Sequence, residues 1–131
     1  MKRTMNLRSR VLVEARRWIG TPYRHQGSCL GAGCDCLGLA YTPDWAERHG
    51  GESLLEAAQR HLVEIDIRNV KPGDVLLFRP ELKGPAKHCA IVSGPTGIIH
   101  AYWGRSVAET ALSHWWQRRL VAAFSFPERA R

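Results

Sequence analysis

One cysteine in this sequence has the surroundings that thiol chemistry requires. Cys36 follows a glycine-rich stretch, residues 24–34, and opens the segment CLGLAY, which is typical of a brief helix. A cysteine at the amino end of a helix gains a dipole that stabilises its thiolate, and a neighbouring imidazole supplies a counter-charge and a base. The sequence therefore predicts a nucleophile at Cys36 and a base from elsewhere in the chain.

Two histidines are spaced so that they can serve this cysteine. His88 opens one predicted strand and His100 lies near the end of the next, with SGPTG between the two strands. If the chain turns at Pro95 and Thr96, the two imidazoles come close together on adjacent strands. One ring can then take the thiol proton while the other orients it, as in a triad of nucleophile, base and orienter.

Other interpretations of these residues compete with the catalytic one. Cys36 can be a buried structural cysteine, and a single histidine on a strand is more often structural than catalytic. A zinc site is a second alternative, although the spacing of its four potential ligands, His25, Cys29, Cys34 and Cys36, matches no standard site. We favour the catalytic hypothesis and predict neither a metal nor a cofactor.

The elements that position these residues form two groups along the chain. Helices come first. An amphipathic helix over residues 7–19 is followed by an irregular stretch over 24–34. Short helices are then predicted after Cys36 and over 43–49, and a longer one from Ser53 to about 61 or 62. Short strands follow, namely VEIDI, VLLF, HCAIVS, GIIHAY, SVAETAL and LVAAFSF, with a brief helix at 113–119. This order predicts a single α+β domain, residues 1–131, with helices covering an antiparallel sheet of about five to six strands.

Composition narrows the class of protein. The chain has 131 residues, of which 44% are hydrophobic and 24% charged, and these values are ordinary for a soluble globular domain. No apolar run approaches the roughly 20 residues of a membrane span, and no signal peptide is evident, so we expect synthesis in the cytoplasm. The formal charge of +7 favours anionic polymers. Because no nucleic-acid motif accompanies the scattered arginines, we predict a solvated basic surface and no nucleic-acid partner.

Four segments together resemble the successive blocks of the NlpC-type cell-wall cysteine peptidases. These segments are GTPYRHQ, GCDCLGLA, PGDVLLF and KHCAIVSGPTGIIHAY, in the family's order and spacing. The branch encoded by phages and gene transfer agents carries similar ARRWIGTPYRHQ, YTPDWAE and RRLVAAF segments, so the likeness spans nearly the whole chain. The resemblance implies a papain-like fold and hydrolysis of peptide bonds in bacterial peptidoglycan stem peptides, with a preference for the bond after γ-linked D-glutamate.

The same resemblance implies a role for particular residues. Cys36 is then the nucleophile, His88 the general base and His100 the orienting residue. Tyr23 matches a family tyrosine that shapes the substrate pocket or oxyanion site, and Asp35 precedes the nucleophile, where it is expected to cap the helix. Cys89 neighbours His88 and should point toward the core on the opposite face of its strand.

One departure from the family keeps two further functions open. Relatives extend the nucleophile helix by roughly two to three turns before YTPDWAE, whereas here Ala40 directly precedes Tyr41. A shortened helix buries less area and has a weaker dipole. Beside a hydrolase that perforates the cell wall from a phage or transfer-agent tail, the sequence thus allows a weakly active tail-tip module that binds peptidoglycan or tail proteins. It also allows a papain-like amidase or acyltransferase.

Overall fold

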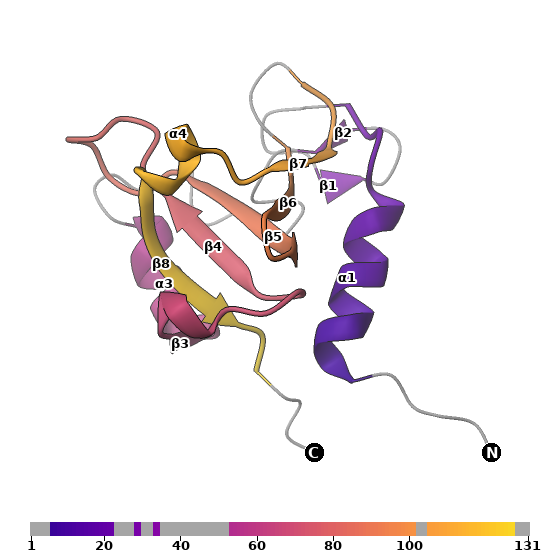
Figure 1. Ribbon diagram of the computed structural model, residues 1–131, viewed down its shortest axis with the longest axis horizontal. Helices are drawn as coiled ribbons and strands as arrows, with labels where there is room; N and C mark the ends of the chain where they lie inside the picture. The colour runs from indigo at the N-terminus through magenta and orange to yellow at the C-terminus, as the bar shows by residue number, and fades with distance from the viewer. Residues whose placement is uncertain (1–5, 23–27, 30–32, 35–52, 102–104, 128–131) are drawn as a thin grey trace.

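A six-stranded antiparallel sheet organises the protein. The computed structural model describes residues 6–22, 28–29, 33–34, 53–101 and 105–127. The strands lie in the order β3-β8-β4-β5-β6-β7 (Figure 1). Their bounds are β3 Val63–Ile65, β4 Val75–Phe78, β5 His88–Gly94, β6 Gly97–His100, β7 Ala108–Ala111 and β8 Leu120–Ser125. The predicted α+β class and the expected number of strands are confirmed.

The first helix begins where the sequence predicts and ends at Arg17, two residues before the predicted end at residue 19. Helix α1, Leu7–Arg17, starts after Asn6, whose side chain accepts a hydrogen bond from the backbone N–H of Ser9. Beyond its end, Gly20 has a φ of +93°, a left-handed conformation that glycine adopts without strain. Ala15 is buried on the inner side of α1, which stands beside the sheet in Figure 1.

A second helix packs on the same face of the sheet. Helix α3, Ser53–His61, buries Leu54 and Ala58 in the cluster that also contains Ala15 and the strand residues Val75, Leu77, Ile91 and Phe124. The predicted helical layer on one face is therefore confirmed. None of the helices in the described part of the chain has the length and apolar character needed to cross a membrane.

The opposite face of the sheet has its own apolar cluster. Phe78, Ala90, Val92 and Ile98 lie here, and Trp116 covers them. Trp116 belongs to the short helix α4, His114–Gln117, which connects β7 to β8 as expected (Figure 1). The two tryptophans of this helix differ in burial, because Trp116 is 9% exposed and packs on the sheet, whereas Trp115 is 40% exposed.

Two expectations about local structure need correction. The stretch 24–34 was expected to be irregular, but β1, Ser28–Cys29, pairs antiparallel with β2, Gly33–Cys34. Such a two-residue ladder rests on backbone hydrogen bonds and needs no apolar period. The segment VEIDI is a strand only to Ile65, because Asp66 caps a 3-10 turn, η1, Ile67–Asn69. The short helices predicted after Cys36 and over 43–49 lie outside the described residues.

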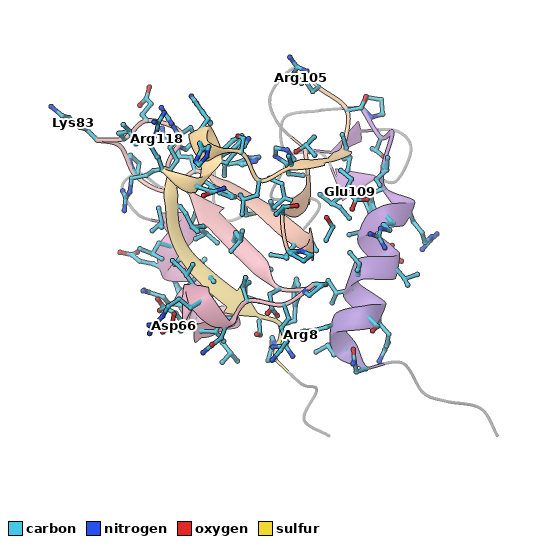
Figure 2. The ribbon with its side chains drawn as sticks, in the orientation of Figure 1. Arg8, Asp66, Lys83, Arg105, Glu109 and Arg118 are labelled. Atoms are coloured by element: carbon cyan, nitrogen blue, oxygen red, sulfur yellow. The ribbon has the colours of Figure 1, made fainter. Side chains whose placement is uncertain are left out.

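A buried carboxylate fastens α1 to the sheet. Asp74, fully buried before β4, accepts a hydrogen bond from Arg8 Nε at 2.9 Å and another from the backbone N–H of Lys71 at 2.9 Å. Figure 2 shows Arg8 between α1 and the sheet. The preceding Gly73 has a φ of +96°, and a Cβ there would lie only 2.7 Å from the Cα of Arg8. The KPGD turn therefore positions α1 through both a charge and a close backbone contact.

Candidate active site

The two histidines singled out in the sequence meet on adjacent strands. His88 begins β5 and His100 ends β6, and both side chains are buried. Gly94 pairs with Gly97, so Pro95 and Thr96 form the expected two-residue turn. His88 Nε2 lies 2.8 Å from His100 Nδ1, which is hydrogen-bonding distance. The predicted approach of the two imidazoles is confirmed.

A third side chain extends this hydrogen-bonded row. His100 Nε2 lies 3.0 Å from Thr110 Oγ1, and Thr110 belongs to β7. In the register of β6 and β7, His100 pairs with Ala108, so Thr110 is a diagonal neighbour of His100 on the same face. The three side chains form a row, His88–His100–Thr110, across three successive strands.

Aromatic side chains enclose the histidine pair. The Trp116 ring stacks on His88, with centroids 4.8 Å apart and 25° between the planes. The same ring lies edge-on to His100, with ring centroids 5.4 Å apart and 86° between the planes. Phe78 lies beside His88 at 5.9 Å. These rings exclude water from the hydrogen bond between the imidazoles, and a hydrogen bond is electrostatically stronger in such a surrounding.

Burial decides the charge of His100. Burial, as the larger cause, and the electrostatic influence of the neighbouring His88 together lower the pKa of His100 from 6.5 to about 3. His100 is therefore neutral near pH 7. A neutral imidazole has one nitrogen that donates and one that accepts a hydrogen bond, so His100 can orient a neighbouring ring without competing for its proton.

A cavity of about 510 Å³ opens beside the row. His100, Thr110 and Trp116 form part of its wall, and Trp115, Ser113 and Arg105 line it further out. The cavity thus combines aromatic surface with hydroxyl and guanidinium groups, as ligand sites commonly do. Within the described ranges, no group of three or more His, Cys, Asp or Glu side chains is arranged to hold a metal ion.

The remaining candidate residues have different outcomes. Cys36, Tyr23 and Asp35 lie outside the described residues, so their roles stay predictions. Cys89 is a buried free cysteine in the core cluster on the helical face, and its predicted orientation is confirmed. Sequence reasoning missed the contact of Thr110 with His100, because the alternating pattern of SVAETAL predicts a strand but does not give its register.

The fold and the histidine pair define a papain-like α+β domain. The family model described as NlpC/P60 family matches residues 20–125. This match covers most of the chain, so the chain belongs to the NlpC/P60 family.

Three proteins illustrate the range of similarity. The chain is 30% identical over 127 residues to the gamma-DL-glutamyl hydrolase of Bacillus subtilis, covering 88% of this chain and 29% of that protein. It is 33% identical over 110 residues to murein DD-endopeptidase MepH of Escherichia coli, covering 80% of this chain and 41% of that protein. The crystal structure of the NlpC/p60 domain of peptidoglycan hydrolase SagA is 26% identical, with a TM-score of 0.67, and the match covers 91% of this chain and 98% of that domain. The chain therefore spans less than half the length of the two relatives.

Proposed function

We propose that this protein is a cysteine peptidase that hydrolyses peptidoglycan stem peptides, with Cys36 as nucleophile, His88 as general base and His100 as the orienting residue. The observation that carries the proposal is the buried contact of 2.8 Å between His88 Nε2 and His100 Nδ1 beside an open cavity. Family membership and relatives named as a glutamyl hydrolase and a murein endopeptidase support the substrate class.

In the proposed mechanism each ring nitrogen of His88 has a separate task. Nε2 faces His100, so Nδ1 is the atom that accepts the thiol proton of Cys36. The thiolate attacks the peptide carbonyl carbon, and the C–N bond breaks as the leaving amine takes the proton from His88. Water then attacks the thioester while His88 accepts a proton from it, and the thiol leaves with that proton. His100, being neutral, keeps its Nδ1 directed at His88 throughout.

Two relatives suggest different bonds. The name of one relative refers to γ-glutamyl hydrolysis, and the name of the other refers to a bond between two D-residues. We propose the bond after γ-linked D-glutamate, which the family resemblance favours. Tyr23 and Asp35 are expected to shape the substrate and oxyanion region.

Product analysis tests both the chemistry and the bond. The parent, Cys36→Ala and Cys89→Ala are incubated with purified peptidoglycan and with defined stem peptides, and the products are identified by mass spectrometry. Cys89 is a matched control because it is buried next to His88 but lies in the core cluster on the helical face. The parent and Cys89→Ala should cleave after γ-D-glutamate, and Cys36→Ala should not. Equal cleavage by Cys36→Ala would exclude the thiol mechanism.

A binding module is the second candidate function. It is favoured by the direct junction of Ala40 and Tyr41, where relatives carry a longer helix. A folded parent that sediments with peptidoglycan but releases no peptide would support this module over the peptidase.

We also propose that the protein acts at the cell wall as part of a phage or gene-transfer-agent tail. The proposal rests on the likeness of ARRWIGTPYRHQ, YTPDWAE and RRLVAAF to that branch of the family. Mass spectrometry of purified tail-bearing particles should detect peptides of this chain in a constant ratio to tail proteins. Recovery only in the particle-free supernatant would contradict this location.

A further inference from the structure

Thr110 contacts His100 at Nε2, the ring nitrogen that does not face His88. It lies on β7, the edge strand of the sheet, and its Oγ1 is 3.0 Å from His100 Nε2. We propose that Thr110 is a positioning residue whose hydroxyl oxygen accepts the Nε2–H of His100 and thereby selects the tautomer in which His88 can accept a proton at Nδ1. This inference rests on the proposed function, because it assigns a fourth residue to the same site.

Counting the protons along the row shows why the tautomer matters. Two neutral imidazoles joined by one hydrogen bond share a single proton between them. If that proton belongs to His88 Nε2, then His88 Nδ1 carries a lone pair and His100 must hold its own proton on Nε2. If it belongs to His100 Nδ1, then His88 carries its proton on Nδ1 and cannot act as a base there. The position of one proton on His100 therefore switches the base on or off.

Thr110 favours the active arrangement because of where its hydroxyl lies. The Nε2–H of buried His100 needs an acceptor, and the hydroxyl oxygen of Thr110 is at hydrogen-bonding distance. Thr110 itself is exposed and lines the cavity, so its own hydroxyl hydrogen can bind water. The opposite direction would leave the hydroxyl oxygen to solvent and place the His100 proton on Nδ1, facing His88.

The same tautomer is needed after proton transfer. Once His88 has accepted a proton, its Nε2–H is part of a cation, and a lone pair on His100 Nδ1 stabilises that cation. His100 stays neutral near pH 7, because burial and the neighbouring His88 together lower the pKa of His100 to about 3. Thr110 thus supports a single proton arrangement of His100 through the whole reaction.

The neighbouring residue provides a matched control. Glu109 precedes Thr110 on β7 and pairs with Arg16 of α1, with Oε2 3.2 Å from Nη2. Figure 2 shows Glu109 beside α1. Glu109→Gln therefore alters the same strand without touching the histidine row. Thr110→Val removes the hydroxyl at nearly constant shape, and Thr110→Ser restores it.

Nuclear magnetic resonance reads the tautomer without requiring activity. Long-range ¹H–¹⁵N correlations are recorded for the histidine-labelled parent, Thr110→Val, Thr110→Ser and Glu109→Gln at pH 7. We expect His100 to carry its proton on Nε2 in every protein except Thr110→Val, where it moves to Nδ1. The inference is overturned if the parent already has the Nδ1–H form, or if Thr110→Val keeps the Nε2–H form.

Kinetics on a defined stem peptide give the second readout. We expect kcat/KM of Thr110→Val to fall roughly tenfold to a hundredfold, through a lower kcat. Losses of this size are typical when a residue that orients a functional side chain by a hydrogen bond is removed. Thr110→Ser and Glu109→Gln should stay within about threefold of the parent. Equal losses in the valine and serine variants would show a structural role of the strand and overturn the inference. A parent that cleaves nothing refutes the proposed function, while the tautomer spectra still decide the role of Thr110.

Discussion

Two buried polar clusters lie in this sheet, and they differ in what their protons can do. The Asp74 cluster holds a fully buried carboxylate with Arg8 Nε at 2.9 Å and a backbone N–H at 2.9 Å. The histidine row, His88–His100–Thr110, is linked by contacts of 2.8 and 3.0 Å. Both clusters contain buried side chains joined by hydrogen bonds, so burial and pairing alone do not distinguish a structural cluster from a functional one.

The difference lies in charge and access. The Asp74 carboxylate pairs with the opposite charge of Arg8, which connects α1 to the turn before β4, and it accepts a backbone N–H within that turn. The histidine row contains imidazole and hydroxyl groups whose protons can change position, and it borders the cavity of about 510 Å³. We infer that the first cluster serves stability and the second serves chemistry. Variants that separate stability from activity test this division.

Replacing His88 should have the largest effect, and on activity. We expect His88→Gln to lower kcat/KM on a stem peptide roughly a thousandfold, because general-base catalysis contributes on this order. The change leaves the Asp74 cluster intact, so far-ultraviolet circular dichroism should match the parent.

An exposed histidine serves as the control for His88. His114 lies on α4, close in sequence to Trp116 but solvent-exposed. His114→Gln should retain kcat/KM within about twofold. If His88→Gln kept more than a tenth of parental activity, the base would have to be another group.

Replacing Gly73 should have the largest effect on stability. A Cβ at this position would meet the backbone of Arg8, and its φ of +96° strains any L-residue. We expect Gly73→Ala to lower the free energy of unfolding by roughly 2–4 kcal/mol, measured by urea denaturation. Gly20→Ala is the matched control, because its φ is +93° but the surrounding space is open. It should cost only about 1 kcal/mol. Equal losses would mean that strain, and not contact with α1, sets the effect.

Much of the architecture followed from local patterns in the sequence. The apolar run VLLF predicted a strand, and it forms β4, in which all four residues are buried. The two-residue turn at Pro95 and Thr96 placed β5 beside β6, so the approach of the two histidine-bearing strands was predictable. The register shift between Val92 and Gly94, which places both imidazoles on one face, was not.

The rest of the site depends on long-range geometry. Thr110 reaches His100 only because of the register between β6 and β7, and no tight turn encodes that register. Trp116 covers His88 because α4 places it on the apolar cluster of the sheet face opposite α1 and α3, which periodicity cannot predict. The pair Ser28–Cys29 and Gly33–Cys34 was missed because its ladder has no side-chain signal. The role of Cys36 still rests on its sequence context.

Neutralising Asp74 should have a moderate effect on stability alone. Asp74→Asn removes the charge that Arg8 contacts, and we expect a loss of about 2 kcal/mol in the free energy of unfolding, since hydrogen bonds to charged groups are worth this much. Activity per folded molecule should stay within twofold. The control is Asp66→Asn, which alters the exposed pair of Asp66 and Arg68 and should leave stability nearly unchanged. A large drop in kcat/KM for Asp74→Asn would end the distinction between the two clusters.

The pH dependence of stability should show the smallest of these effects. Here the histidine row, and not the Asp74 cluster, should change the measured free energy of unfolding. The pKa of His100 is about 3 in the folded protein against an ordinary value of 6.5, so between these values the unfolded chain binds a proton that the folded protein does not. Acidification through this range therefore favours unfolding, whereas above pH 6.5 the group has no influence. The slope contributed by His100 is at most about 1.4 kcal/mol per pH unit.

Urea denaturation between pH 7 and pH 5 keeps most carboxylates ionised, and the difference between the parent and His100→Asn separates the slope of His100 from that of the other histidines. The parent should lose stability as pH falls, and His100→Asn, which has no titrating ring at this position, should lose less. Asp74→Asn should keep the parental slope despite its lower stability. If the parent and His100→Asn had parallel curves, His100 would not be held neutral by burial, and its proposed role as a neutral orienting group for His88 would fail with it.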